Sequence, residues 1–307
     1  MLVSIIVCSY NPSRYSDLVD ALNSLLDQRY DDIEVIVVVD GSDELYDKVL
    51  NYINQIDVDI KVILNEKNLG LSESRNHGIE IAKGDVIVFF DDDAVADKNW
   101  IRELVYMYEE YDAIAAGGKL IPLWVGRKMD FLPEEYYWLI GATHKGFPEE
   151  IAEVRNTFGS NISFRTDVLR SLGGFESELG LTASKKGAFQ GEETELCIRM
   201  KQRFGKGVMY NPNAIVQHKI VGERVKVRFL LNRAFWQGYS KRVMEKMSIN
   251  SLGVEKSFLR KLILESVPDR IIGMIRSPSI ASIEQFILLF VFTFATGTGY
   301  VFKALQR

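Results

Sequence analysis

The chain has 307 residues, of which 47% are hydrophobic and 26% charged, with a formal net charge of −5. This composition excludes a disordered or collagen-like chain, and the length allows one large domain or two smaller ones. The two cysteines, Cys8 and Cys197, lack the spacing of a zinc site or a disulfide framework, so we expect a reducing, cytosolic setting. The chain starts directly with an apolar run, and we predict no signal peptide.

The charge is distributed unevenly along the chain. Residues 1–216 contain 22 Lys and Arg against 36 Asp and Glu, whereas residues 217–307 contain 15 against 6. An acidic front part and a basic tail indicate two different tasks. The basic tail indicates either nucleic acid or an anionic membrane as its partner.

The N-terminal part alternates between short apolar runs and segments with apolar residues at helical spacing. Strands are predicted over residues 2–9, 34–39, 61–64 and 85–90, and helices over 14–27, 43–53, 72–82 and 99–111. This alternation predicts an α/β fold with a mostly parallel central sheet and helices on both faces. Ligands of such sheets bind at the loops that follow the strands.

Three consecutive aspartates, Asp91, Asp92 and Asp93, follow the buried strand predicted at 85–90. Carboxylates this close together repel one another unless a cation joins them. The sequence therefore predicts a divalent-metal site that holds a diphosphate. The alternatives are a solvated acidic loop or a cap for the helix that follows.

The loop after the first strand excludes two common phosphate-binding sites. It reads Ser9-Tyr10-Asn11-Pro12 and has neither G-x-G-x-x-G nor G-x-x-x-x-G-K-S/T. A dinucleotide-binding fingerprint and a Walker loop are therefore both absent from this position. Acidic residues recur at the same sheet edge, so a phosphate ligand there would need a bridging cation.

Six motifs follow one another over about residues 1–220. They lie at residues 4–11, 38–42, 68–79, 90–93, 173–175 and 192–199, and His218 follows them. Each motif is weak alone, but together they resemble the family-2 glycosyltransferases, which have the GT-A fold. The resemblance implies transfer of a sugar from a nucleotide diphosphate to a hydroxyl, with inversion at the anomeric carbon.

The resemblance also implies a metal site. Asp91 and Asp93 would hold a divalent cation, and His218 would complete the site. Oxygen ligands favour Mg²⁺ or Mn²⁺, and an imidazole leans toward Mn²⁺. Without the resemblance, His218 reads as a histidine at the surface or at a strand end.

By the same resemblance, Ser9, Tyr10, Asp40, Arg75 and Asp92 would bind the nucleotide donor. Asp40 would accept the uracil N3–H, although Asp-Gly-Ser is also ordinary turn chemistry. Arg75 would reach the nucleotide or its phosphates; its alternative is a solvated helix face.

One departure from the family pattern concerns the residues that would bind the nucleobase. Val39 stands where the family usually has a first aspartate. The second aspartate, Asp40, is kept, so a UDP-sugar remains the expected donor.

The acceptor hydroxyl must lose its proton, which requires a general base. Glu193 aligns with the family's catalytic aspartate and is the preferred base, and Glu192 is the neighbouring candidate. The replacement of Asp by Glu moves the carboxylate by about one bond length. Both glutamates could instead be acids in the first turn of a helix, where the helix dipole favours them.

The tail contains two segments of interest. Residues 217–246 carry eight Lys and Arg and two Glu, and we predict a helix that either lies on an anionic membrane or packs on the catalytic domain. Residues 285–302 carry no charge and are at the lower length limit for a span. A re-entrant or interfacial helix is preferred over a full crossing, and a dimer contact is the soluble alternative.

We therefore predict a catalytic domain over 1–220 and a helical, membrane-associating region over 221–307. The expected acceptor is a lipid-linked saccharide or a polyprenyl- or dolichyl-phosphate sugar on the cytoplasmic side of the membrane. Segments 138–141 and 236–241 resemble archaeal enzymes of this group, including glucuronosyltransferases. No nucleic-acid partner is expected, and an oligomer is left open.

Two other functions are considered. A nucleotidyltransferase also uses acidic metal sites on an α/β sheet, but it usually needs a Gly-rich, basic loop after the first strand. A non-catalytic nucleotide-sugar-binding membrane protein would need no base, and the Glu192-Glu193 pair argues against it.

Overall fold

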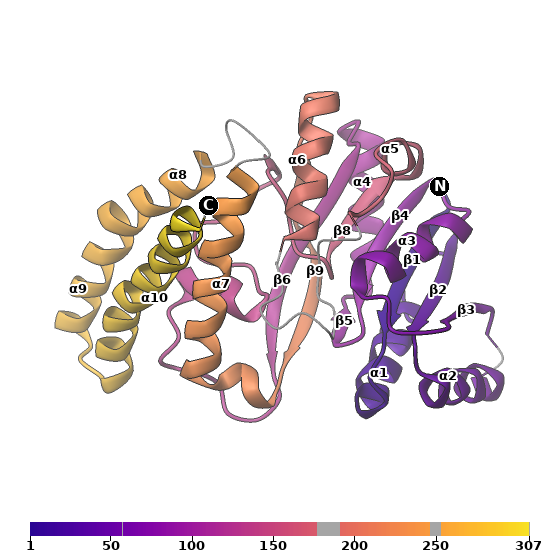
Figure 1. Ribbon diagram of the computed structural model, residues 1–307, viewed down its shortest axis with the longest axis horizontal. Coiled ribbons are helices and arrows are strands. Elements are labelled where there is room, and N and C mark those ends of the chain that lie inside the picture. The colour runs from indigo at the N-terminus through magenta and orange to yellow at the C-terminus, as the bar shows by residue number, and fades with distance from the viewer. Residues whose placement is uncertain (57, 177–190, 246–252, 307) are drawn as a thin grey trace. The chain divides into compact units, whose positions relative to one another are not determined.

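The computed structural model describes residues 1–56, 58–176, 191–245 and 253–306 (Figure 1). The chain forms two compact units. The first contains Met1–Ile121 and Pro148–His218, and the second contains Pro122–Phe147 and the chain from Lys219 onward. The division predicted at residue 220 differs from these units in the placement of residues 122–147.

The first unit is built on four parallel strands in the order β3-β2-β1-β4. The strands are β1 (Val3–Ser9), β2 (Ile33–Asp40), β3 (Ile60–Asn65) and β4 (Val86–Asp91). A short 3-10 helix, η1 (Pro12–Arg14), follows β1, and the helices are α1 (Tyr15–Leu26), α2 (Asp43–Ile56), α3 (Leu71–Ile81) and α4 (Trp100–Glu110). All eight predicted elements are confirmed, with small changes at their ends.

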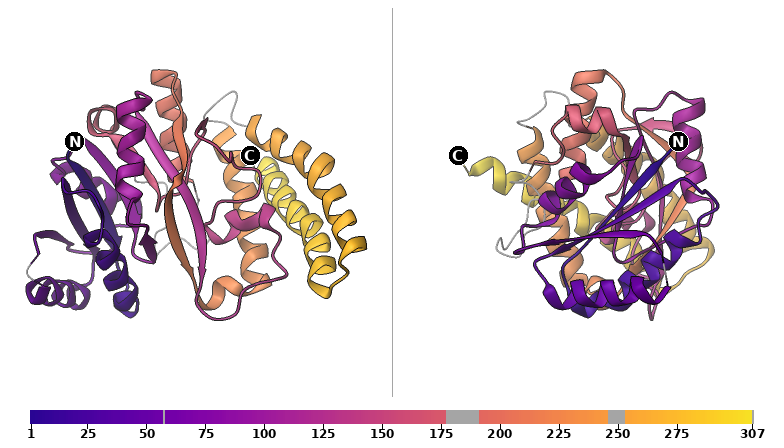
Figure 2. Two further views of the ribbon diagram at one scale, coloured as in Figure 1. Left: turned by 180° about the vertical axis from the view of Figure 1, so that it is seen from behind. Right: turned by 90° about the vertical axis from the view of Figure 1, so that its right-hand side faces the viewer.

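Each strand of this sheet buries side chains on both of its faces. In β1, Ile5 and Val7 belong to one apolar cluster and Ile6 belongs to the other. Helices α1, α2 and α4 contribute to the first cluster, and α3 contributes to the second. Runs that are apolar on both faces are typical of strands covered by helices on both sides. Figure 2 shows these layers from two further directions.

Antiparallel strands extend the sheet beyond β4. They are β5 (Ala94–Ala96), β6 (Ala115–Trp124), β7 (Ala152–Val154), β8 (Ile162–Arg165) and β9 (Val208–Ile220), joined by α5 (Thr166–Ser171) and α6 (Glu192–Phe204). Ala94 of β5 pairs with His218 of β9. Since Ala94 directly follows Asp93, this long-range pairing carries His218 to the aspartates.

The second unit is mainly helical. It contains η2 (Glu134–Ile140), η3 (Gly222–Val225), α7 (Val227–Glu245), α8 (Gly253–Lys261), the π-helical turn η4 (Leu262–Ser266), α9 (Val267–Arg276) and α10 (Ile280–Leu305). The basic segment 217–246 was predicted as a helix, but its first residues still belong to β9. The reason is that β9 pairs as far as Ile220, and α7 begins only at Val227.

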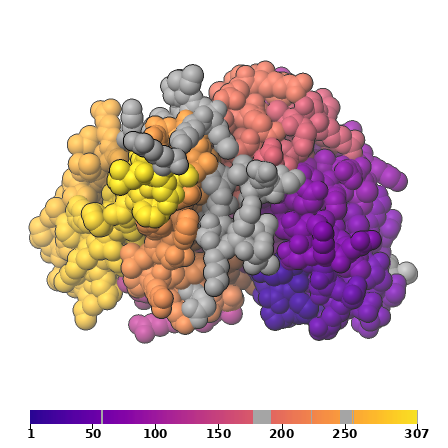
Figure 3. Space-filling model, viewed as in Figure 1, coloured from indigo at the N-terminus to yellow at the C-terminus, as the bar shows by residue number. Residues whose placement is uncertain are grey.

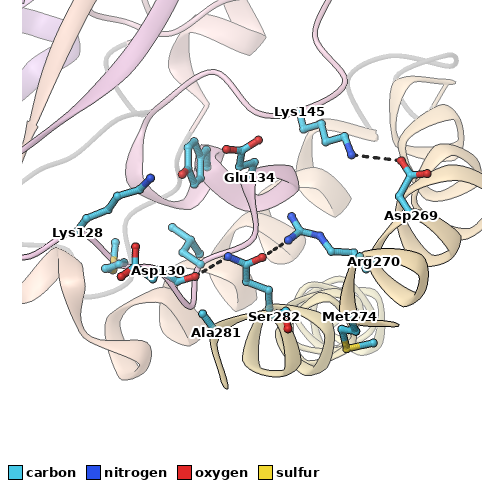
Figure 4. A pocket seen from close by; sticks show the side chains of 14 residues that line it. Lys128, Asp130, Glu134, Lys145, Asp269, Arg270, Met274, Ala281 and Ser282 are labelled. Atoms are coloured by element: carbon cyan, nitrogen blue, oxygen red, sulfur yellow. Dashed lines mark hydrogen bonds and ion pairs between the residues drawn. The ribbon is translucent and has the colours of Figure 1, made fainter. Parts of the chain in front are cut away.

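A cavity of about 650 Å³ lies in the second unit (Figure 4). Several of its polar lining residues contact one another. Lys145 Nζ lies 3.5 Å from Asp269 Oδ2, and Gln285 bonds both Arg270 and the carbonyl oxygen of Asp130. These contacts fasten the polar sides of α9 and α10 to residues 128–145.

Asn161 is a fully buried amide that ties three elements of the first unit together. Its Oδ1 accepts from the indole N–H of Trp100 at 2.9 Å, and its Nδ2 donates to the carbonyl oxygens of Ala214 (2.8 Å) and Lys119 (3.1 Å). Asn161→Ala leaves these buried groups unpaired, so we expect the free energy of unfolding to fall by about 3 kcal/mol. Urea denaturation measures this change.

The control for this variant is Asn51→Ala, on the exposed side of α2. We expect it to change the free energy of unfolding by less than about 0.5 kcal/mol. Equal effects of the two substitutions would contradict the role assigned to Asn161.

Candidate active site

The predicted site residues gather at the carboxyl edge of the parallel strands. β1 lies between β2 and β4, with Ser9 paired to Val39 and Cys8 paired to Asp91. Ser9, Asp40 and Asp91 are therefore the last residues of three neighbouring strands. This placement agrees with the rule that ligands bind beyond the carboxyl ends of parallel strands.

Two residues of the aspartate cluster, Asp92 and Asp93, are buried, and the cluster holds a cation from the chain itself. Ser9 Oγ donates to Asp92 Oδ2 at 2.5 Å, and Arg14 Nη2 lies 3.0 Å from Asp92 Oδ1 and also pairs with Asp93. Burial, together with the charge of Asp93, raises the pKa of Asp92 to about 7. Burial raises the pKa of Asp91 as well. The cluster therefore favours a positive partner.

Sequence reasoning missed Arg14. The signal available was its place in η1, which directly follows the loop after β1 and therefore stands at the same sheet edge. Its side chain is only about a quarter exposed, so its charge is directed to the aspartates rather than to solvent.

The predicted metal ligands are brought together in part. His218 Nε2 lies 3.3 Å from Asp93 Oδ2, and both side chains are buried. Asp91 Oδ1 instead lies 3.4 Å from Arg75 Nη2. Within the described ranges, no three His, Cys, Asp or Glu side chains are spaced as a metal site. Carboxylate oxygens and one imidazole nitrogen nevertheless form a donor set that suits Mg²⁺ or Mn²⁺.

Arg75 is the central cation of the site. It is 2% exposed, and its guanidinium lies 3.1 Å from Glu193 Oε1, 3.5 Å from Glu192 Oε1 and 3.4 Å from Asp91 Oδ1. Burial lowers its pKa, but the three carboxylates raise the pKa further, so Arg75 stays charged. The alternative of a solvated helix face is wrong.

Arg75 is also held by aromatic rings. Its guanidinium carbon lies 5.6 Å from the ring centroid of Phe89 and 5.1 Å from that of Phe175. Cation–π contacts of this kind fix the plane of the guanidinium. Phe175 is the last residue of the motif at residues 173–175, so this motif contributes one of the rings that contact Arg75.

The two candidate bases differ in their surroundings. Glu192 and Glu193 begin α6, and Glu192 Oε2 accepts from the backbone N–H of Gly191 at 3.1 Å. The Glu193 side chain is 17% exposed, against 7% for Glu192. Burial and the neighbouring Glu192 raise the pKa of Glu193. Glu193 is therefore the more open of the two carboxylates.

Gly159 makes room for the ion pair between Arg75 and Glu193. It is the second feature of the site that the sequence did not predict. A Cβ atom at this position would lie 2.0 Å from Glu193 Oε1 and 2.5 Å from Arg75 Nη2. Contacts this short are not tolerated, so any side chain here would displace the ion pair.

Asp40 organises the loop that follows β3. Its carboxylate accepts from the backbone N–H groups of Leu69 (2.9 Å) and Gly70 (2.8 Å) and from Asn65 Nδ2 (2.9 Å). Gly41 adopts φ +71°, and a Cβ there would lie 2.2 Å from the nitrogen of Asn68. The turn role is therefore present, and binding of uracil by Asp40 stays a prediction.

The two remaining donor-side predictions differ in accessibility. Ser9 is 3% exposed and bound to Asp92, so it positions that carboxylate. Tyr10, the next residue, is 54% exposed at the same sheet edge and can contact a ligand.

Two solved structures share this fold at low sequence identity. The mannosyltransferase PcManGT from Pyrobaculum calidifontis, in complex with GDP-Man and Mn²⁺, is 15% identical with a TM-score of 0.60, over 99% of this chain and 86% of that one. S. aureus TarS in complex with UDP-GlcNAc is 18% identical with a TM-score of 0.56, over 96% of this chain and 82% of that one. These likenesses confirm the GT-A fold.

A curated relative matches over nearly the full length. It is the glucosyl-dolichyl phosphate glucuronosyltransferase of Haloferax volcanii, 42% identical over 306 residues, which cover 99% of this chain and 97% of that protein. The model of "Glycosyl transferase family 2" matches residues 4–173, which include the aspartate cluster and the Arg75 helix. The chain therefore belongs to glycosyl transferase family 2.

Proposed function

We propose that the protein is a metal-dependent, inverting glucuronosyltransferase. Its donor would be UDP-glucuronic acid, and its acceptor the sugar hydroxyl of a dolichyl- or polyprenyl-phosphate glucose. The name of the Haloferax volcanii relative and the match along almost the whole of both chains support these substrates. Membership of glycosyl transferase family 2 argues against the alternative that the protein is a nucleotidyltransferase.

One observation carries the mechanism. Arg75 contacts both Glu193, the candidate base, and Asp91 of the aspartate cluster. The proposed base and the groups proposed to lie beside the departing diphosphate would therefore belong to one connected site. A protein that only bound nucleotide-sugars would have no need of this connection.

On the acceptor side, Glu193 would take the hydroxyl proton as that oxygen attacks the anomeric carbon. The bond between this carbon and the diphosphate oxygen breaks on the opposite face, which inverts the configuration. The raised pKa of Glu193 suits this role, because a stronger base accepts the proton more readily. Arg75 holds the carboxylate in place, and Gly159 leaves it the room.

On the donor side, Asp91, Asp93 and His218 would hold the cation. A bound Mn²⁺ or Mg²⁺ supplies charge neutralisation for the leaving diphosphate. Ser9 and Arg14 hold Asp92 in the same cluster, and Arg14 adds a positive charge beside the expected phosphates. Tyr10 would face the nucleobase of the donor. The carboxylate of Asp40 can still accept one more hydrogen bond, which the uracil N3–H would donate.

The acceptor also defines the expected location. A lipid-linked acceptor requires the enzyme to work at a membrane, and we place it on the cytoplasmic side. Among the described residues, one helix, α10, is long and apolar enough to cross a membrane. It belongs to the second unit, which has the basic tail.

The activity is tested with the purified full chain. UDP-glucuronic acid, Mn²⁺ and a synthetic isoprenyl-phosphate glucose are incubated, and mass spectrometry follows the gain of one glucuronosyl residue. UDP-glucose and GDP-mannose serve as competing donors. Transfer from another donor would refute the glucuronosyl assignment, and donor binding without transfer from any would favour a binding protein.

Glu193→Gln keeps the shape of the base but removes its proton affinity. We expect transfer to fall by about 10²- to 10⁴-fold while UDP binding is retained. Glu192→Gln is the matched control, and its effect should be much smaller because Glu192 faces Gly191. A larger loss in the Glu192 variant would move the base to that residue.

The pH dependence follows from the raised pKa of Glu193. The base must be ionised, so kcat/KM should fall as the pH falls through a pKa above the ordinary value of 4.5. Measured at saturating metal, this acidic limb should be absent from the residual activity of Glu193→Gln. If the variant keeps the limb, the titrating group is one of the aspartates.

Asp93→Asn tests the metal site by binding alone. We expect wild-type protein to bind UDP in a Mn²⁺-dependent manner, and the variant to lose about tenfold or more of that affinity. Asp47→Asn, an exposed position on α2, makes the same charge change and serves as the control. Equal, metal-independent binding by the variant would make the aspartates structural. Calorimetric titration of UDP, GDP and dTDP also tests which nucleobase the site prefers.

A further inference from the structure

Helix α10 is buried along one side and exposed along the other. Leu289, Phe292 and Gly299 are buried against the second unit. The opposite side carries an apolar stripe at spacings of three, four and seven residues, and each of these side chains is between 51% and 78% exposed: Ile283, Ile287, Phe290, Phe294, Val301 and Leu305. The C-terminal part of α10, in yellow, forms part of the molecular surface in Figure 3.

The buried side is fixed to α7 by direct backbone contact. A Cβ at Gly238 would lie 1.8 Å from the carbonyl oxygen of Thr296, and a Cβ at Gly299 would lie 1.9 Å from that of Phe235. Only glycine permits so close a crossing, as in other helix pairs with small residues at the contact. Helix α10 is therefore an integral part of its unit.

Polar partners accompany α10 on this buried side. The hydroxyl groups of Tyr136 and Thr293 are 2.5 Å apart, and Tyr300 Oη donates to Glu245 Oε2 at 2.5 Å. Helix α7 itself carries five charged residues: Arg228, Arg233, Lys241, Arg242 and Glu245. A bilayer crossing by α10 would bring α7 along, and each charge at the centre of a bilayer costs about 3 kcal/mol.

The apolar surface continues at the turn between α9 and α10. Ile275 and Ile280 flank this turn and are 77% and 79% exposed. Residues 253–307 contain seven lysines and arginines against four acids, and Arg260, Lys261 and Arg276 are exposed. An exposed apolar stripe in a segment with a basic excess suits an anionic lipid surface.

We propose that α10 lies in the plane of the membrane interface, with its outer stripe in the lipid and both of its ends on the same side. At 26 residues the helix is about 39 Å long, so this contact extends along the bilayer surface. The occupant of the stripe is an anionic bilayer, and the second unit is monotopic. This inference rests on the proposed function and adds to it how the protein would contact the membrane. Its test does not use the transfer reaction.

Flotation with vesicles tests the docking surface. Full-length protein should float with vesicles that contain phosphatidylglycerol and less with pure phosphatidylcholine. Ile287→Glu combined with Phe294→Glu should lower the bound fraction by about tenfold. The control, Phe204→Glu at the end of α6, changes an exposed aromatic residue away from the stripe and should float like wild type.

Cysteine labelling distinguishes an in-plane helix from a crossing one. Ser277→Cys and Ala304→Cys, made singly, bracket α10 at exposed positions, and wild type reports the background of Cys8 and Cys197. On sealed vesicles, a membrane-impermeant maleimide should label both positions before detergent is added. Protection of one position until detergent is added would overturn the proposal in favour of a span.

Two further outcomes would also overturn it. If wild type does not float and is a dimer that the double variant converts to a monomer, the stripe is a contact between two copies. If the double variant floats as well as wild type, the membrane contact lies elsewhere. Transfer to a short, soluble acceptor, measured on the same preparations, shows separately whether the proposed activity holds.

Discussion

The candidate site depends on one buried cation. Arg75 neutralises Asp91, Glu192 and Glu193, which come from β4 and α6, and its guanidinium also contacts the rings of Phe89 and Phe175. A buried charge is tolerated only when it is paired, and removing one partner of such a group leaves the others uncompensated. Without Arg75, three carboxylates would repel one another in a poorly hydrated space. The acid that we propose as the base and the acids proposed to lie beside the diphosphate share a site because this guanidinium lies between them.

The parallel half of the sheet could be predicted from sequence because its signals are local. Runs such as residues 35–39 are apolar throughout, and the helices between the strands keep their apolar spacing, so each element is visible within a short window. Parallel strands also place all their carboxyl ends at one edge, which was enough to group Ser9, Asp40 and the three aspartates. The motifs then supplied roles for these residues by resemblance.

The remaining features are long-range and have no local signal. Arg75 and Glu193 are 118 positions apart, and the pairing that carries His218 to Asp93 joins β5 to β9. Arg14 and Gly159 matter only through what they approach in space. The C-terminal helices also could not be assigned from sequence. The spacing of apolar residues along a helix is the same whether that face contacts protein or lipid. The glycines at 238 and 299 show that one side of α10 meets α7, and this becomes visible only when the two helices are placed together.

If Asp40 binds the nucleotide as proposed, its hydrogen bonds have a consequence for nucleotide exchange. Three donors from the chain already hold this carboxylate, and with it the loop of residues 68–70, before any ligand arrives. A loop that is ordered in advance costs little entropy when the nucleotide binds, and none has to be recovered when it leaves. Such a rim cannot reshape itself around a different base. The enzyme would then discriminate between nucleotides because a wrong base does not fit the preformed loop. The product nucleotide would also leave without a rearrangement of this loop.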